Sequence, residues 1–119
     1  MAYMLLMMEP TGQRRTRTPE QGREVYGRMV QWGEQLKSRG LLLASESLSL
    51  GPETARVQVR DGQRRIVDGP FSEAKELVGG FFLVDVATRE QAVAIAAECP
   101  AAEWCTVEVR ALMPCYESA

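Results

Sequence analysis

Residues 68–86 read DGPFSEAKELVGGFFLVDV and join a sharp turn, a run of charges and an apolar strand. Gly69 can adopt a positive φ and the ring of Pro70 fixes its own φ, so the chain turns sharply at this point. Successive side chains of a strand point to opposite faces. The apolar residues from 78 to 86 therefore fall on both faces of their strand, which predicts a sheet that is covered on both sides.

Strands and helices alternate around this segment. Two similar boxes, TPEQ at 18–21 and TREQ at 88–91, each follow an apolar run and have the pattern that caps the start of a helix. They predict helices from Thr18 to about Arg39 and from Thr88 to Pro100. The apolar runs and alternating stretches predict strands at 3–8, 41–50, 78–86 and 104–112, and a hairpin of 55–60 and 64–67 that turns at Asp61-Gly62, with one side facing water.

This order predicts one α+β domain over residues 1–119, a ferredoxin-like split βαβ sandwich with an extra β-hairpin. Both helices are expected on one face of an antiparallel sheet. The strand at 3–8, like the strand at 78–86, has apolar residues on both of its faces, and two helices cover only one face of a sheet. We therefore expect a second copy of the chain to bury the other face in a two-fold homodimer, with a cleft between or within the subunits.

The composition excludes several classes of function. Apolar residues make up 45% of the chain and charged residues 25%, and the net charge of -2 implies no general attraction to nucleic acid or to a membrane. The three cysteines have no spacing typical of a disulfide framework or a zinc site, and the apolar start is too short for a signal peptide. We expect a cytoplasmic protein. The basic cluster of Arg14, Arg15 and Arg17 could bind phosphate groups, but it is interleaved with Thr rather than aromatic residues, which favours a solvated loop.

The chain contains no histidine. Nucleophile pairs that need histidine, a histidine general base and the commonest metal ligand are therefore all missing. Any acid–base chemistry at neutral pH falls to a carboxylate, Lys, Tyr or Cys with a shifted pKa. The sequence suggests neither a metal site nor a cofactor.

The densest set of candidate side chains lies after the turn. It contains Asp68, Glu73, Lys75 and Glu76, and Glu46 can join it from the second strand. The Asp68 carboxylate can either cap the amides of the turn, which is the commoner role, or face a cavity. A charge run of this kind is most often a solvated surface, and this reading is favoured for Glu73 and slightly for Glu76.

Two consecutive glycines, Gly79 and Gly80, follow this set of charged residues in the sequence. Gly79-Gly80 allows a ligand or another chain to approach the strand closely, and it is equally well explained as a β-bulge. A gap lined by Phe71, Phe81, Lys75 and a carboxylate would suit a small organic anion. Cys105, on an alternating strand, is expected to be a small buried hydrophobe.

Asp68-Gly69-Pro70-Phe71 resembles the signature of the YCII-related, or DGPF-domain, family. The resemblance covers nearly the whole chain, including the opening 3–6, Glu46, the segment 68–76, the strand from Gly79 and the ending 101–110. It implies a dimeric α/β barrel whose wider relatives act on small cyclic or chlorinated organic acids. Some members are thought to use a His-Asp pair, of which only Asp68 has a match here. Genes of such proteins often lie beside those of extracytoplasmic-function sigma factors.

Two functional hypotheses follow. In the first, the cleft binds a small organic acid or lactone, Lys75 holds the anion, and Asp68 or Glu76 moves a proton in an isomerase or lyase reaction. In the second, the protein is a non-catalytic sensor or a docking partner linked to a sigma factor, and the same residues serve only geometry. Fold alone does not decide between them.

Overall fold

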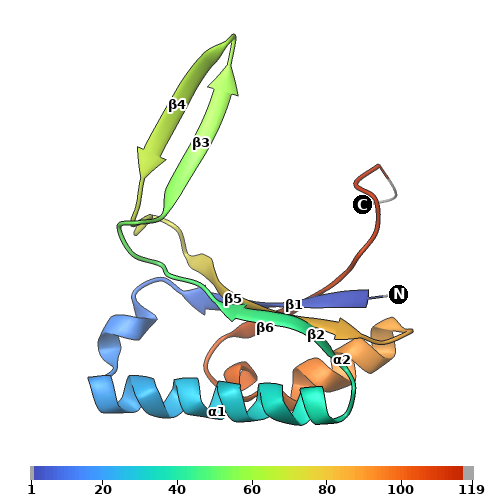
Figure 1. Ribbon diagram of the computed structural model, residues 1–119. Helices are drawn as coiled ribbons and strands as arrows, with labels where there is room; N and C mark the ends of the chain where they lie inside the picture. The colour runs from blue at the N-terminus through green and yellow to red at the C-terminus, as the bar shows by residue number, and fades with distance from the viewer. Residues whose placement is uncertain (1, 117–119) are drawn as a thin grey trace.

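Residues 2–116 are described by the computed structural model drawn in Figure 1. Its main sheet has the strand order β2-β5-β1-β6, and every neighbouring pair is antiparallel. These strands are β1 (Ala2–Pro10), β2 (Leu42–Ser47), β5 (Glu76–Asp85) and β6 (Thr106–Ala111). Helices α1 (Pro19–Ser38) and α2 (Arg89–Glu98) cover one face of this sheet and leave the other face open (Figure 1). The predicted ferredoxin-like α+β sandwich is confirmed.

Both predicted capping boxes start their helices. The hydroxyl of Thr18 accepts a hydrogen bond from the backbone N–H of Gln21, whose side chain accepts one from the N–H of Thr18. Thr88 and Gln91 form the same reciprocal pair at the start of α2. Each box satisfies two N–H groups that a helix start leaves without partners. Short 3-10 turns follow β1 (η1, Gln13–Thr16) and α2 (η2, Pro100–Glu103).

The core lies between the helices and the sheet. Leu5 in β1, Leu36 in α1 and Val84 in β5 are completely buried, and the edge of the Trp32 ring meets Phe82 with the ring centres 4.7 Å apart. The side chains of β1 alternate between this buried face and the open face, as a two-sided strand requires.

The second strand is shorter than the sequence predicts. The alternation at 45–50 favoured a strand up to Leu50, whereas β2 ends at Ser47. Ser47 pairs with Gly80, and Leu48 then donates its N–H to the carbonyl of Gly79, 2.9 Å away. At this point two residues of β5, Gly79 and Gly80, stand opposite Met7 alone, which is the predicted β-bulge. The bulge bends β5, so β2 loses its partner there.

The predicted hairpin forms and stands away from the body of the molecule (Figure 1). It consists of β3 (Ala55–Arg60) and β4 (Gln63–Asp68), joined by Asp61 and Gly62, which both have positive φ. We call this hairpin the arm. We expected one side of the arm to face water, but all twelve residues of its strands are exposed in the single chain. The radius of gyration is 16.1 Å, against about 13.5 Å for a compact chain of this length, because the arm projects.

Candidate functional site

A cavity of about 440 Å³ lies between α1 and the helix-covered face of the sheet. Its apolar wall combines side chains from four places in the chain. Met7 comes from β1, Val25 and Met29 from α1, Phe82 from β5 and Trp104 from the residue after η2. The size and the mainly apolar lining are typical of sites for small organic molecules.

An ion pair between the buried Glu9 and the partly exposed Arg14 lines the cavity. Glu9 is only 8% exposed, and its two carboxylate oxygens accept hydrogen bonds of 2.8 and 2.7 Å from Nε and Nη2 of Arg14. Arg14 also donates to the carbonyls of Leu48 and Gly79, at 2.9 and 3.0 Å. A buried carboxylate needs such a partner, since removing it from water unpaired is costly.

The bulge glycine makes room for this pair. A Cβ atom on Gly79 would overlap the Glu9 carboxylate and lie 2.8 Å from Nη2 of Arg14. The close approach that Gly79-Gly80 allows is thus used by a side chain of the same subunit. Gly79-Gly80 forms a β-bulge and also allows a close contact, which is made by Glu9 of the same chain.

Arg17 lines the cavity, as does the exposed Lys37, and among the described residues neither cation forms an ion pair. The guanidinium of Arg17 lies 5.8 Å from the centre of the Trp104 ring. Arg28 also lies over this ring, at 5.2 Å, but its charge is paired with Glu103 at 2.7 Å. The prediction of a solvated loop fits Arg15, which is exposed, but Arg17 is half-buried, and the partly exposed Arg14 is paired with Glu9; both Arg14 and Arg17 line the cavity.

Cys105 lines the cavity but is poorly suited to act as a nucleophile. Burial raises the pKa of its thiol to about 11, and the negative charge of Glu9 adds to the shift. The thiolate is the reactive form of cysteine, and very little of it exists at neutral pH with such a pKa. The predicted hydrophobic role fits Cys105, although the residue is only half-buried.

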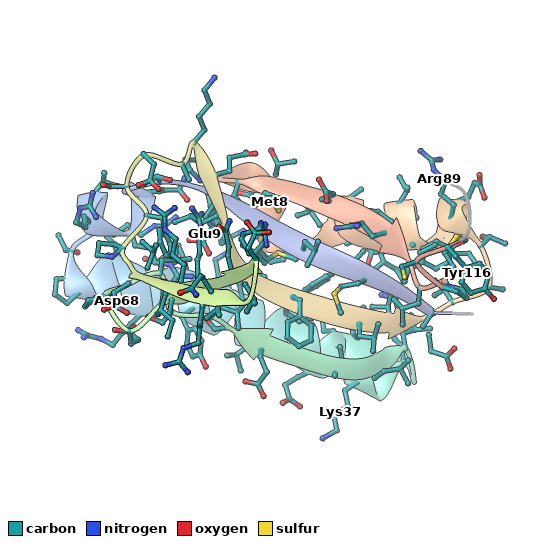
Figure 2. The ribbon with its side chains drawn as sticks, turned by 90° about the horizontal axis from the view of Figure 1, so that it is seen from above. Met8, Glu9, Lys37, Asp68, Arg89 and Tyr116 are labelled. Carbon is teal, nitrogen blue, oxygen red and sulfur yellow. The ribbon has the colours of Figure 1, made fainter. Side chains whose placement is uncertain are left out.

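The structure does not gather the predicted site residues around one cavity. Asp68 is exposed at the base of the arm, where Figure 2 labels it, and Lys75 and Glu76 are exposed at the start of β5. No side-chain hydrogen bond to Asp68 is present among the described residues, so the predicted turn cap is not seen. The proposed proton-transfer roles of Asp68 and Glu76 and the anion-binding role of Lys75 stay predictions.

Two of the predicted ligand-binding residues lie near the sheet. Glu46 is among the residues that border the cavity beneath α1, but it stands opposite Phe81 in the β2–β5 register, so its side chain shares the open face with Phe81 and points away from the helix-covered side. Phe71 is buried and lines a second cavity at the base of the arm, together with Leu48 and Leu77.

The signature turn supports the arm. The guanidinium of Arg56 in β3 lies 3.8 Å from the centre of the Phe71 ring, and it is 3.6 Å from a carboxylate oxygen of Glu73. Gly69 donates its N–H to the carbonyl of Thr54, and a Cβ on Gly69 would come within 3.0 Å of the Thr54 side chain. The DGPF segment therefore packs tightly against the residues where the arm begins.

Sequence reasoning missed Glu9 as a site residue and assigned Arg14 and Arg17 to a solvated loop in preference to an anion-binding cluster. A signal for Glu9 was present, because it continues the alternation of Tyr3, Leu5 and Met7 onto the buried face. A carboxylate on a buried face requires a cation, and Arg14 is the nearest arginine in the sequence. The contribution of Trp104 had no comparable local signal.

The sheet order, the two helices on one face and the cavity beneath α1 define an α+β sandwich of the ferredoxin-like class with a binding-type pocket. The chain belongs to the family of the YCII-related domain, whose model matches residues 1–115. No curated protein matches it. No described helix has the length and apolar character needed to cross a membrane, and residues 2–116 contain no cluster of metal-binding side chains.

Proposed function

We propose that this protein binds a small, largely apolar molecule with an anionic group, such as an organic acid, in the cavity beneath α1. The observation that carries the proposal is the combination of apolar walls with a half-buried arginine, Arg17, that also lines the cavity. The sequence already favoured a small organic acid or lactone as ligand, and the cavity offers that ligand a different place from the DGPF turn.

Arg14 and Arg17 differ in what their guanidinium groups contact, and this difference supports an anionic ligand. Arg14 uses Nε, Nη1 and Nη2 on Glu9, Leu48 and Gly79, so its donors are engaged within the protein. Arg17 has its guanidinium over an aromatic ring, where it keeps its N–H donors. A carboxylate that enters the cavity can therefore bind Arg17, while Met29 and Phe82 contact its apolar part.

A thermal-shift screen tests the proposal. Each small aromatic or alicyclic carboxylic acid is compared with its own methyl ester, so that only the charge differs. A ligand at about 100 times its dissociation constant stabilises the folded state by about 2.7 kcal/mol. We expect acids to stabilise the wild type more than their esters do, and Arg17→Gln to weaken acid binding about tenfold, because charge-assisted hydrogen bonds contribute about 1.5–3 kcal/mol.

Arg15→Gln is the matched control, because Arg15 lies in the same short turn but is exposed. It should leave the preference for acids unchanged. Met29→Trp, which fills the cavity, should abolish binding of acids and esters alike. The proposal is wrong if no acid in the panel binds, or if Arg15→Gln and Arg17→Gln have equal effects.

The proposal includes a homodimer formed through the open face of the sheet. Phe81 and Leu6 are neighbours in one row across this face, and Glu46 and Glu108 end the row at the two sheet edges. The next row also has apolar residues, Leu83 and Met4, in the middle, and it ends at Ala44 on one edge and at the charged Arg110 on the other. An apolar centre with a charged rim is the usual anatomy of a protein–protein interface, and a second copy offers a surface of the same pattern.

A further inference from the structure

The arm has two unlike faces. Residues that stand opposite each other in the β3–β4 register share a face. One face carries Ala55, Arg64 and Asp68 beside three large apolar residues, Val57, Val59 and Ile66. These three side chains are 61, 59 and 52% exposed. The other face is polar and carries Arg56, Gln58, Arg60, Gln63 and Arg65 beside Val67. An amphipathic pattern of this kind is expected of a strand pair with one covered face, yet no element within residues 2–116 covers it.

In the part of the chain that the structure describes, no helix or strand packs extensively against the arm beyond its base. The two strands contact each other extensively, and no other described element packs against them to a comparable extent. A two-stranded hairpin alone is marginally stable in water, because it has no core of its own. The apolar side chains of the arm are therefore suited to pack against another surface, and the described residues do not provide one.

The position of the arm points to a second copy of the chain as that partner. The arm rises from the open side of the sheet, opposite the helices (Figure 1), and Figure 2 looks down onto that side. A copy stacked on the open face would therefore lie beside the arm. Stacked sheets are about 10 Å apart, and six paired residues extend about 20 Å, so the arm is long enough to pass the sheet of the second copy and reach its helix layer.

Charge supports the same partner. The arm carries four arginines, Arg56, Arg60, Arg64 and Arg65, against Asp61 and Asp68, so its net charge is +2. The whole chain has a net charge of -2, which leaves -4 on the rest. A basic arm on an acidic body favours association between copies, since unlike charges attract over distances of the order of a Debye length.

We propose that the arm is an exchanged dimer clasp: the face with Val57, Val59 and Ile66 packs against the second subunit, and the second subunit's arm does the same in return. This inference rests on the homodimer of the proposed function. It gives the DGPF turn a role, because Phe71, Glu73 and Gly69 fix the base from which the arm projects.

Light scattering coupled to size-exclusion chromatography tests the clasp over a range of micromolar concentrations. The wild type should have twice the subunit mass of 13.2 kDa. The double variant Val57→Lys with Val59→Lys should raise the dimer dissociation constant at least 100-fold and give a monomer. Gln58→Lys with Gln63→Lys adds the same charge to the other face and should change that constant less than threefold. Circular dichroism should show the same secondary structure for all three proteins.

Hydrogen exchange supplies an independent measurement. In the wild-type dimer, side-chain burial at the clasp should slow amide exchange in residues 57–59 and 64–66, and the protection should fall on dilution. A monomeric wild type would overturn both the homodimer and the clasp. A wild-type dimer that survives the valine substitutions with an unprotected arm would overturn the clasp alone and leave the homodimer standing.

Discussion

The body of the molecule and the arm use the same kinds of residue and give them opposite surroundings. Val84 in β5 is completely buried, whereas Val57 in β3 is 61% exposed, although both lie in regular antiparallel strands. In the body, α1 and α2 cover the face of the sheet on which Val84 lies. In the arm, the two strands pair with each other, and no described helix lies on either face. The comparison teaches that alternation decides which residues share a face, and that only packing decides whether that face is covered.

The largest expected effect comes from the body's core. Leu36→Ala removes a completely buried side chain between α1 and the sheet, and should lower the free energy of unfolding by about 3 kcal/mol. Gln58→Ala on the polar face of the arm should change it by less than about 0.5 kcal/mol. Urea denaturation at one fixed protein concentration measures both. Equal costs for the two variants would break the distinction between body and arm.

A second prediction compares two glycines. Gly79→Ala pushes a methyl group into the Glu9–Arg14 pair, and should cost about 2–3 kcal/mol by separating a buried carboxylate from its cation. Gly27→Ala lies in α1 with no heavy atom within 4 Å of the added carbon, and should stabilise the protein by roughly 0.5–1 kcal/mol. Thermal melts give both values. A tolerated Gly79→Ala would show that the ion pair is not tightly held.

The smallest effect concerns the thiols. Burial raises the pKa of Cys99 and Cys105 from 9.0 to about 11, while Cys115 is exposed. A chromogenic disulfide reagent at pH 8 should modify Cys115 quickly and the other two only after unfolding. The folded state retains these protons longer than the unfolded state, so the stabilisation from the protonated thiols is present below pH 9 and is lost as the pH rises toward 11. Rapid reaction of all three thiols would show an open interior.

Much of the architecture was predictable because its signals are local. The Thr18 and Thr88 boxes, the Asp61-Gly62 turn and the two-sided strand at 78–86 each depend on residues a few positions apart. The errors came from contacts between distant segments. The second strand ended early because of the Gly79 bulge, and Arg14 was not free in solvent because it reaches Glu9, Leu48 and Gly79.

The candidate site was predicted less well than the fold. Glu46 and the Gly79-Gly80 pair border the cavity beneath α1, but most of its lining was not foreseen, since Trp104 and Met29 are 75 positions apart in the chain. The charged run after the signature turn drew attention because its residues are adjacent in sequence. Adjacent charges at the start of a strand need not converge, and Lys75 and Glu76 are both exposed.

The sequence by itself determined the helices, the strands and the faces that their residues share, because hydrogen-bonded caps, turns and side-chain periodicity act over a few residues. The tertiary structure decided where the cavity lies, that Arg14 is engaged and Arg17 is not, and that the arm leaves the body. These features depend on which distant segments meet and on the space between them, and no short-range pattern encodes that.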